Sequence, residues 1–176
     1  VRVRRSSDDA EQDFTSAEIL DGTLVSWVGA GNDGFVAIWY DQSGNNKHED
    51  NSLIPTRQRQ IVVAGVLATK NGKPTLLSTP SRYGGTIGYT SVSADKTVLS
   101  VFNHNYLLNN EQPQFLSNQF DGYYLAVDSA TRVAVRISNA INSDAVRVTN
   151  GAQSLVVTTA KPVGGIIRIN GVVGVD

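Results

Sequence analysis

The residues best placed to do chemistry in this chain form a polar loop that directly follows an apolar, aromatic run. In Asp41–Asn45 (DQSGN) side-chain oxygens recur at alternate positions, as in the first half of a twelve-residue calcium-binding loop. The sixth position of that pattern is Asn46 instead of glycine, and the twelfth is Ser52 instead of glutamate. Two interpretations stay open. Asp41 holds a calcium ion with other loop oxygens, or Asp41 and Ser43 accept hydrogen bonds from backbone N–H groups where the preceding strand ends.

Other arrangements of catalytic or ligand-binding residues do not fit their context. The two histidines, His48 and His104, have no partner at metal-binding spacing, and no Gly-x-Ser-x-Gly motif supplies a serine nucleophile. The absence of cysteine excludes disulfides, a thiol nucleophile and a thiolate metal site. Residues 29–34 (GAGNDG) match Gly-x-Gly-x-x-Gly, but a dinucleotide site needs that loop to open a helix, and here it precedes a strand. We interpret it as a flexible connection.

Carboxylates offer one further chemistry, the hydrolysis of a glycosidic bond, which needs two of them on either side of the bond. The polar loop and the residues after it provide only Asp41 with Glu49 or Asp50. Because no second catalytic carboxylate occupies a recognisable position, we expect the chain not to be an enzyme.

Aromatic side chains can bind a sugar, because an indole or phenol ring covers the apolar face of a pyranose. Trp39 and Tyr40 are strand neighbours and point to opposite faces, so they cannot form one platform, and we expect Trp39 to be buried between sheets. Loops 82–89 and 103–110 combine aromatic residues with Gly, Asn and His, which suits a ligand site on a rigid scaffold. The predicted ligand-binding residues in or beside these loops are Tyr83, Tyr89, His104 and Tyr106. The alternative is that the loops are only long connections or contacts to neighbouring subunits.

Turn signals divide the chain into short strands. The run 35–40 is apolar, rich in β-forming residues and too short for a typical helix, which predicts a strand buried on both faces. Asn-Gly and Asp-Gly pairs supply the positive φ of two-residue hairpin turns, so we expect the strands beside each pair to be antiparallel neighbours. Such pairs separate 61–69 from 74–77, 115–120 from 123–127, 145–148 from 154–159 and 166–169 from 172–175. The one helix expected is 21–28, with Asp21 as its N-cap.

The composition is that of an ordinary globular protein. With 176 residues the chain can bury a substantial core, and 40% hydrophobic against 18% charged residues excludes a disordered chain. A net charge of −1 gives no basis for a nucleic acid or an anionic membrane as partner, and no apolar run approaches the roughly 20 residues of a membrane helix. Because methionine is absent, we expect a piece of a longer chain.

These patterns together predict an all-β fold. The expected architecture is a two-sheet, jelly-roll-like antiparallel sandwich with at most one or two short helices. Because no repeat, linker or low-complexity segment interrupts the chain, we expect residues 1–176 to form a single domain.

Three segments together resemble a known group of domains. The opening VRVRRSSDDAEQD, the segment WYDQSGN at 39–45 and NGKP at 71–74 are similar to concanavalin A-like, laminin-G-like β-sandwich domains of phage tail and other virion proteins and of secreted bacterial proteins. The shorter YDQSG also resembles a segment in the catalytic domain of fungal α-L-arabinofuranosidases. The similarity covers roughly residues 1–75, and no catalytic carboxylate of the arabinofuranosidases matches a position in this chain.

The resemblance implies a non-enzymatic, virion-associated module of a tail, fibre or decoration protein. Such a module acts in adhesion and carbohydrate binding or in particle structure, so the expected location is the virion or the extracellular space. Its expected partners are a surface glycan or neighbouring virion subunits, and its multimeric state follows from the parent assembly. No cofactor is expected beyond the calcium ion considered at Asp41. The alternative is a glycoside hydrolase-type (arabinofuranosidase-like) domain or a secreted carbohydrate-binding module.

Overall fold

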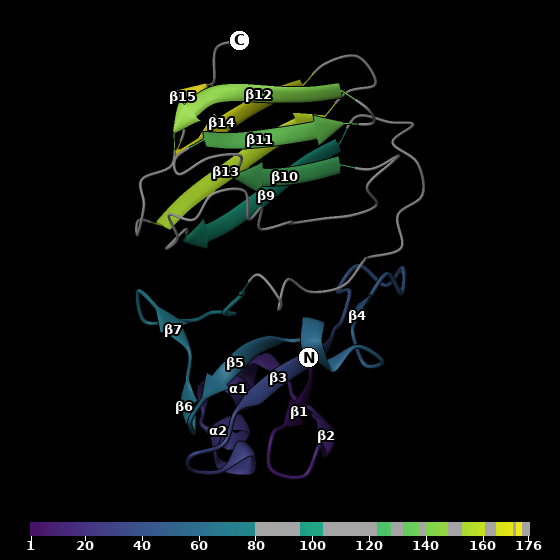
Figure 1. The fold of residues 1–176 in the computed structure, drawn as a ribbon, viewed down its shortest axis with the longest axis vertical. Coiled ribbons are helices and arrows are strands. Elements are labelled where there is room, and N and C mark those ends of the chain that lie inside the picture. The colour runs from purple at the N-terminus through teal and green to yellow at the C-terminus, as the bar shows by residue number, and fades with distance from the viewer. Residues whose placement is uncertain are drawn as a thin grey trace. The chain divides into compact units, whose positions relative to one another are not determined.

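A computed structural model shows two compact units, Val1–Gly88 and Tyr89–Asp176 (Figure 1). The described residues lie mostly in antiparallel β-sheets, with two short α-helices, and this confirms the predicted all-β class at that level. The prediction of one domain over residues 1–176 stays a prediction. The structure describes residues 1–79, 96–103, 123–127, 132–137, 140–147, 153–160, 165–170 and 172–173.

The first unit is built on one antiparallel sheet with the strand order β2-β1-β3-β5-β6, in which β4 also pairs with β3. The strand bounds are β1 Arg2–Arg5, β2 Glu11–Asp13, β3 Gly34–Trp39, β4 Glu49–Asp50, β5 Arg59–Val63 and β6 Val66–Leu67. A separate hairpin follows, formed by β7 (Thr69–Lys70) and β8 (Lys73–Pro74), and a 3₁₀ turn, η1 (Pro55–Arg57), precedes β5.

The helix expected at 21–28 is confirmed as α2 (Thr23–Val28), and a second short helix that was not expected, α1 (Ser16–Leu20), precedes it. Helix α1 begins with a capping box, in which the Thr15 hydroxyl accepts from the Glu18 N–H and the Glu18 carboxylate accepts from the Thr15 N–H. The predicted N-cap role of Asp21 is wrong, because Asp21 ends α1 and Gly22, with φ of +91°, is the N-cap of α2. The Asp21 carboxylate still accepts from the N–H of Thr23, at 2.9 Å.

One face of the sheet packs against α2 to form the core of the first unit. Strands β1, β3 and β5 contribute side chains to it, and α2 covers them because its apolar residues recur on one face of the helix. The buried members of the core are Val3, Phe14, Leu24, Val28, Val36, Ile61 and Val62.

Two-residue turns shape the edge of this unit. The turn Asn71-Gly72 joins β7 to β8 with φ of +51° and +72°, which confirms the predicted hairpin. The expected single strand 61–69 is wrong, because a second turn at Ala64-Gly65, with φ of +49° and +81°, folds β6 back on β5.

The Ala64-Gly65 turn lies against the glycine-rich segment 29–34. The N–H of Gly65 donates to the carbonyl of Asn32 at 2.7 Å, and a Cβ on Gly65 would stand 2.9 Å from both Ala30 Cα and Gly31 N. Segment 29–34 therefore packs against this turn, and the two backbones approach each other closely. That contact is more specific than the flexible connection predicted from the sequence.

The second unit contains two further antiparallel sheets, β10-β11-β12 and β15-β14-β13-β9. They lie in separate layers, and β12 approaches β14 (Figure 1). The strand bounds are β9 Lys96–Asn103, β10 Tyr123–Val127, β11 Arg132–Ile137, β12 Ala140–Arg147, β13 Gln153–Ala160, β14 Gly165–Ile169 and β15 Val172–Val173.

Of the hairpins predicted for this unit, one is confirmed, one is wrong and one includes a strand outside the described residues. The pairing of Ile169 with Val172 confirms the one at Asn170-Gly171. The one at Asn150-Gly151 is wrong, because β12 and β13, on either side of that pair, belong to different sheets. The strand expected at 115–120 lies outside the described residues.

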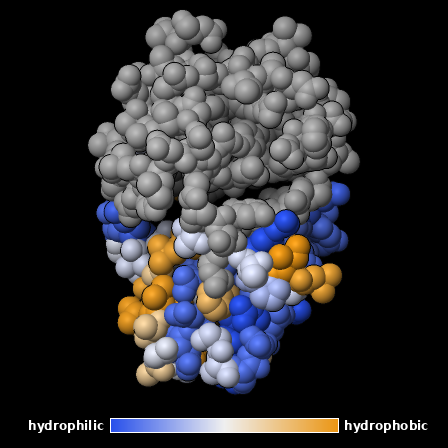
Figure 2. Space-filling view, in the orientation of Figure 1, coloured by the Kyte–Doolittle hydropathy of each residue, from blue (hydrophilic) through white to orange (hydrophobic). Residues whose placement is uncertain are grey.

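Within the described part of the chain, no helix has the length and apolar character needed to cross a membrane. Figure 2 shows that the apolar side chains on the described surface of this view are interspersed with hydrophilic ones.

Candidate functional site

Among the residues whose burial the structure describes, Trp39, the last residue of β3, is the large aromatic side chain left most accessible. It exposes 47% of its surface, whereas Phe35 at the other end of the strand exposes 5%. The prediction that Trp39 is buried between sheets is therefore wrong. The strand is buried only through Ala37, and exposure rises through Ile38 to Trp39.

The partner of Trp39 across the sheet is Glu49 of β4. Residues directly opposite each other in an antiparallel pair share a face, with Cβ atoms roughly 5 Å apart. Glu49 Oε2 accepts a hydrogen bond from Arg59 Nη1 at 3.3 Å, and the side chains of this ion pair are only 15% and 13% exposed. A hydrogen-bonding donor and acceptor therefore lie beside the open indole.

Asn51 completes this polar group. Its Nδ2 donates to Glu49 Oε1 at 3.2 Å, and its backbone N–H donates to the Ala37 carbonyl at 2.7 Å, which fixes it to β3. Asn51 is 4% exposed, and its Oδ1 accepts no hydrogen bond from any residue that the structure describes. A buried acceptor without a donor is uncommon in folded proteins.

Gln58 holds the loop that carries Asn51. It is fully buried, its Nε2 donates to the Asn51 carbonyl at 3.0 Å, and its Oε1 accepts from Arg4 Nε at 2.8 Å. The Arg4 guanidinium also lies 4.9 Å from the centre of the Phe35 ring. These contacts join β1, β3 and the segment between β4 and β5, so the surroundings of Trp39 are preorganised.

The loop after Trp39 is closed by its own hydrogen bonds. Asp41 Oδ1 accepts from the Ser43 N–H at 2.8 Å, and Oδ2 accepts from the Ser43 hydroxyl at 2.7 Å and the Lys47 N–H at 3.1 Å. These bonds, that of the Ser43 hydroxyl first, lower the pKa of Asp41 to about 2. The structure thus has Asp41 in the second of its two predicted roles, as an acceptor of N–H groups.

The calcium role of Asp41 stays a prediction. Among the residues that the structure describes, no three His, Cys, Asp or Glu side chains lie together as a metal site. The backbone N–H of Asp41 donates to His48 Nδ1 at 3.0 Å, which ties the base of the loop to the imidazole.

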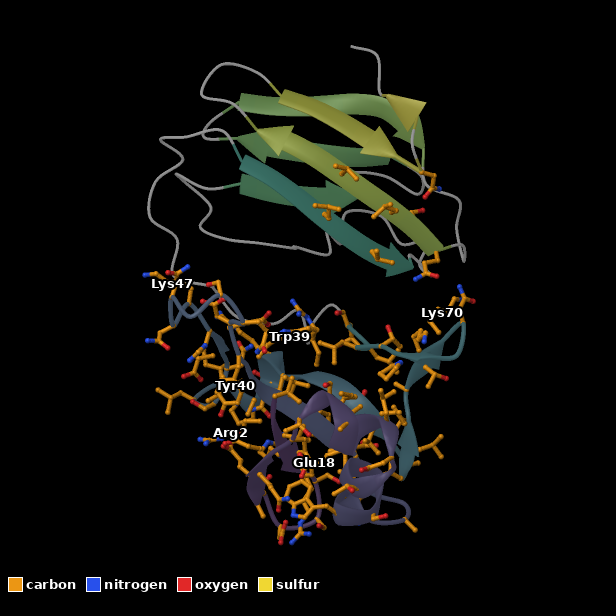
Figure 3. The ribbon with its side chains drawn as sticks, turned by 180° about the vertical axis from the view of Figure 1, so that it is seen from behind. Arg2, Glu18, Trp39, Tyr40, Lys47 and Lys70 are labelled. Carbon is orange, nitrogen blue, oxygen red and sulfur yellow. The ribbon has the colours of Figure 1, made fainter. Side chains whose placement is uncertain are left out.

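Tyr40 lies beside Arg2 and serves as a link between strands (Figure 3). Its hydroxyl donates to Asp13 Oδ1 at 2.6 Å, while Arg2 donates to both carboxylate oxygens of Asp13 at 3.0 and 3.1 Å. The hydrogen bonds from Arg2 and then Tyr40 lower the pKa of Asp13, and burial together with the bond to Asp13 raises the pKa of Tyr40. The Tyr40 hydroxyl is committed to the fold, which leaves Trp39 as the open ring at this edge.

The four residues predicted to bind a ligand are not brought into this site by the described structure. Tyr83, Tyr89, His104 and Tyr106 lie outside the described residues and stay predictions. Sequence reasoning missed Asn51, Gln58 and the pairing of Glu49 with Arg59. Gln58 stands between two arginines, a context typical of exposed residues, and β4 is too short to give a strand pattern.

No family model, curated protein or solved structure matches this chain, so the resemblance to laminin-G-like domains stays an expectation.

Proposed function

We propose that this chain is a non-enzymatic, glycan-binding module of a virion-associated or extracellular protein, and that Trp39 is the surface on which a sugar ring stacks. The finer fold prediction, a jelly-roll-like sandwich of the laminin-G type, belongs to the same proposal. The observation that carries it is the half-exposed indole of Trp39 at the end of a strand that is buried from Gly34 through Ala37.

The physical argument starts from the surface that a ligand can cover. Trp39 leaves about 100 Å² of largely apolar surface open, and covering it at about 25 cal/mol per Å² contributes about 2.5 kcal/mol. That is less than the roughly 4 kcal/mol that corresponds to a millimolar Kd. Hydrogen bonds from the polar group beside Trp39 must add to it, and useful attachment needs several copies on one particle.

A hydrolytic role is less well supported by the same geometry. A carboxyl group with a pKa of about 2, such as Asp41, stays ionised near neutral pH and cannot act as a general acid. Glu49 is engaged by Arg59 and Asn51. The acid of a glycosidase needs a raised pKa, whereas the pKa of Asp41 is lowered.

A glycan array probed with a multimerised form of the chain tests the proposal. We expect the wild type to bind glycans on the array, Trp39→Ala to lose this binding, and Trp39→Phe to keep part of it. Leu20→Ala is the control, because it removes an exposed apolar side chain from α1, away from β3.

Three results would contradict the proposal. Absence of any glycan binding by the wild type would leave a structural role in a particle as the remaining function. Binding that survives Trp39→Ala but is lost in Tyr83→Ala or Tyr106→Ala would move the site to the loops singled out in the sequence. Hydrolysis of aryl glycosides that disappears in Asp41→Asn would establish the enzyme alternative.

A further inference from the structure

The polar group beside Trp39 has a composition that selects among sugars. We infer that the Glu49–Arg59 pair binds two adjacent hydroxyls of the ring stacked on Trp39, and that the site therefore takes neutral glycans. This inference rests on the proposed function and deepens it by naming the ligand class.

The argument begins with the position of the pair. Glu49 is the register partner of Trp39, so its side chain leaves the sheet on the face from which the indole is accessible. Arg59 Nη1 lies 3.3 Å from Glu49 Oε2, which places a second charged group at the same spot. A sugar ring lying on the indole would have its rim of hydroxyls at this pair.

The chemistry of the pair suits a diol. A carboxylate only accepts hydrogen bonds and a guanidinium only donates them, whereas a hydroxyl does both. Two neighbouring hydroxyls can therefore donate to Glu49 and accept from Arg59 at the same time. Bonds to charged groups are stronger than those between neutral groups, so the pair gives orientation as well as affinity.

The charge of the pair sets the ligand class. Glu49 and Arg59 neutralise each other, and both side chains are largely withdrawn from water. A uronate would bring a second carboxylate close to Glu49, and an amino sugar would bring a cation close to Arg59. Like charges repel most strongly where water is scarce. A neutral hexose avoids both penalties.

Two features suggest that the group does more than stabilise the fold. Desolvation makes a largely buried ion pair a weak source of stability. In addition, Asn51 Oδ1 is buried and accepts no hydrogen bond within the described part of the chain, although its Nδ2 is bound to Glu49. If the Asn51 amide moves slightly when a sugar binds at Glu49, a sugar hydroxyl would donate a hydrogen bond to Asn51 Oδ1.

The first part of the test compares the affinities of the wild-type chain for related ligands. Its probes are the neutral hexose oligosaccharide with the strongest array signal, its monodeoxy analogues at two adjacent positions, and its uronate counterpart. With the wild-type chain we expect each monodeoxy analogue and the uronate to bind about ten- to a hundredfold more weakly than the parent, as measured by isothermal titration calorimetry.

Variants then assign the hydroxyls. In Glu49→Gln, one of the two monodeoxy analogues and the uronate should each bind within about threefold of the parent oligosaccharide. In Arg59→Gln, the other monodeoxy analogue should bind within about threefold of the parent. The matched controls are Glu11→Gln on β2 and Lys47→Gln in the neighbouring loop, which remove the same charges from exposed positions. They should keep the full wild-type penalties.

The outcomes separate this inference from the proposed function. Deoxy penalties that are equal in wild type and variants, or a uronate that binds as tightly as the neutral parent, would overturn the inference while glycan binding by Trp39 stands. Absence of binding by the wild type, or binding indifferent to Trp39→Ala, would overturn the proposed function itself. If either variant fails to fold, as judged by circular dichroism, the wild-type comparison of neutral, deoxy and uronate ligands decides.

Discussion

The glycines of the two tight turns in the first unit offer a matched test of how this unit is held together. Gly65 and Gly72 occupy the second position of equivalent two-residue turns, with φ of +81° and +72°. A Cβ on Gly72 would meet nothing within 4 Å, whereas on Gly65 it would stand 2.9 Å from Ala30 Cα and from Gly31 N. Replacement by alanine therefore adds the same backbone strain at both positions and a steric clash at only one.

The expected magnitudes follow from these contacts. Alanine at positive φ costs roughly 1–2 kcal/mol, which is the whole effect expected for Gly72→Ala. In Gly65→Ala the clash is with backbone, so the turn must lift, and this breaks the bonds from Gly65 N to Asn32 O at 2.7 Å and from Gly31 N to Ala64 O at 3.3 Å. The backbone strain, the two lost hydrogen bonds at about 1 kcal/mol each and the lost packing together lower the free energy of unfolding by about 4 kcal/mol.

Urea denaturation followed by tryptophan fluorescence measures the difference, because both tryptophans of the chain, Trp27 and Trp39, lie in the first unit. With a slope of about 2 kcal/mol per molar urea, the midpoint should fall by about 2 M for Gly65→Ala and by less than 1 M for Gly72→Ala. Asparagine, which tolerates positive φ, should be accepted at position 72 and rejected at position 65. Losses that agree within about 1 kcal/mol at the two positions would refute the close approach of the turn to segment 29–34.

Three further predictions concern the surroundings of the candidate site. Trp39→Ala should cost only about 1–2 kcal/mol in urea denaturation, against roughly 3–5 kcal/mol for a buried tryptophan, because half of the side chain is open; a larger loss would mean that it is core. Gln58→Met should cost about 3 kcal/mol by removing the bonds to Arg4 and to the Asn51 carbonyl, whereas Gln12→Met at an exposed position should stay within about 0.5 kcal/mol. The pKa of Asp41 in the folded state is lowered to about 2, so the contribution of Asp41 to stability is present above its ordinary pKa near 3.8 and is lost as the pH falls through about 2. In Asp41→Asn the free energy of unfolding should therefore depend less on pH between 4 and 2 than in the wild type. An unchanged pH profile would contradict the loop geometry.

The parts of the fold that the sequence predicted well are those fixed by local conformation. The hairpins at Asn71-Gly72 and Asn170-Gly171 follow from residues that accept positive φ. Helix α1 also carried a local signal, the capping box of Thr15 and Glu18, which the expectation of one helix overlooked. The turn at Ala64-Gly65 lacked such a signal, because alanine is not typical of positive φ.

The parts that could not be predicted depend on contacts between distant segments. Asn-Gly closes a hairpin at other positions, whereas at Asn150-Gly151 it lies in the connection between two different sheets. The dipeptide alone does not determine which of these two connections forms. Gln58 is buried because Arg4, 54 residues earlier, reaches its side chain. The pairing of Arg59 with Glu49 likewise becomes visible only when β4 and β5 both lie next to β3.

The wrong prediction for Trp39 is the one on which the proposed function rests. The run 35–40 is apolar throughout, and that pattern carries no information about how far the neighbouring strands extend. In the structure β4 pairs with β3 at only two positions, Ile38 and Trp39, and burial decreases at both. About half of the hydrophobic stabilisation available to the indole is therefore not realised within the fold. The buried bonds of Gln58 and Asn51 nevertheless fix the backbone beside it, an arrangement that suits a ligand which covers the ring and supplies the missing contacts.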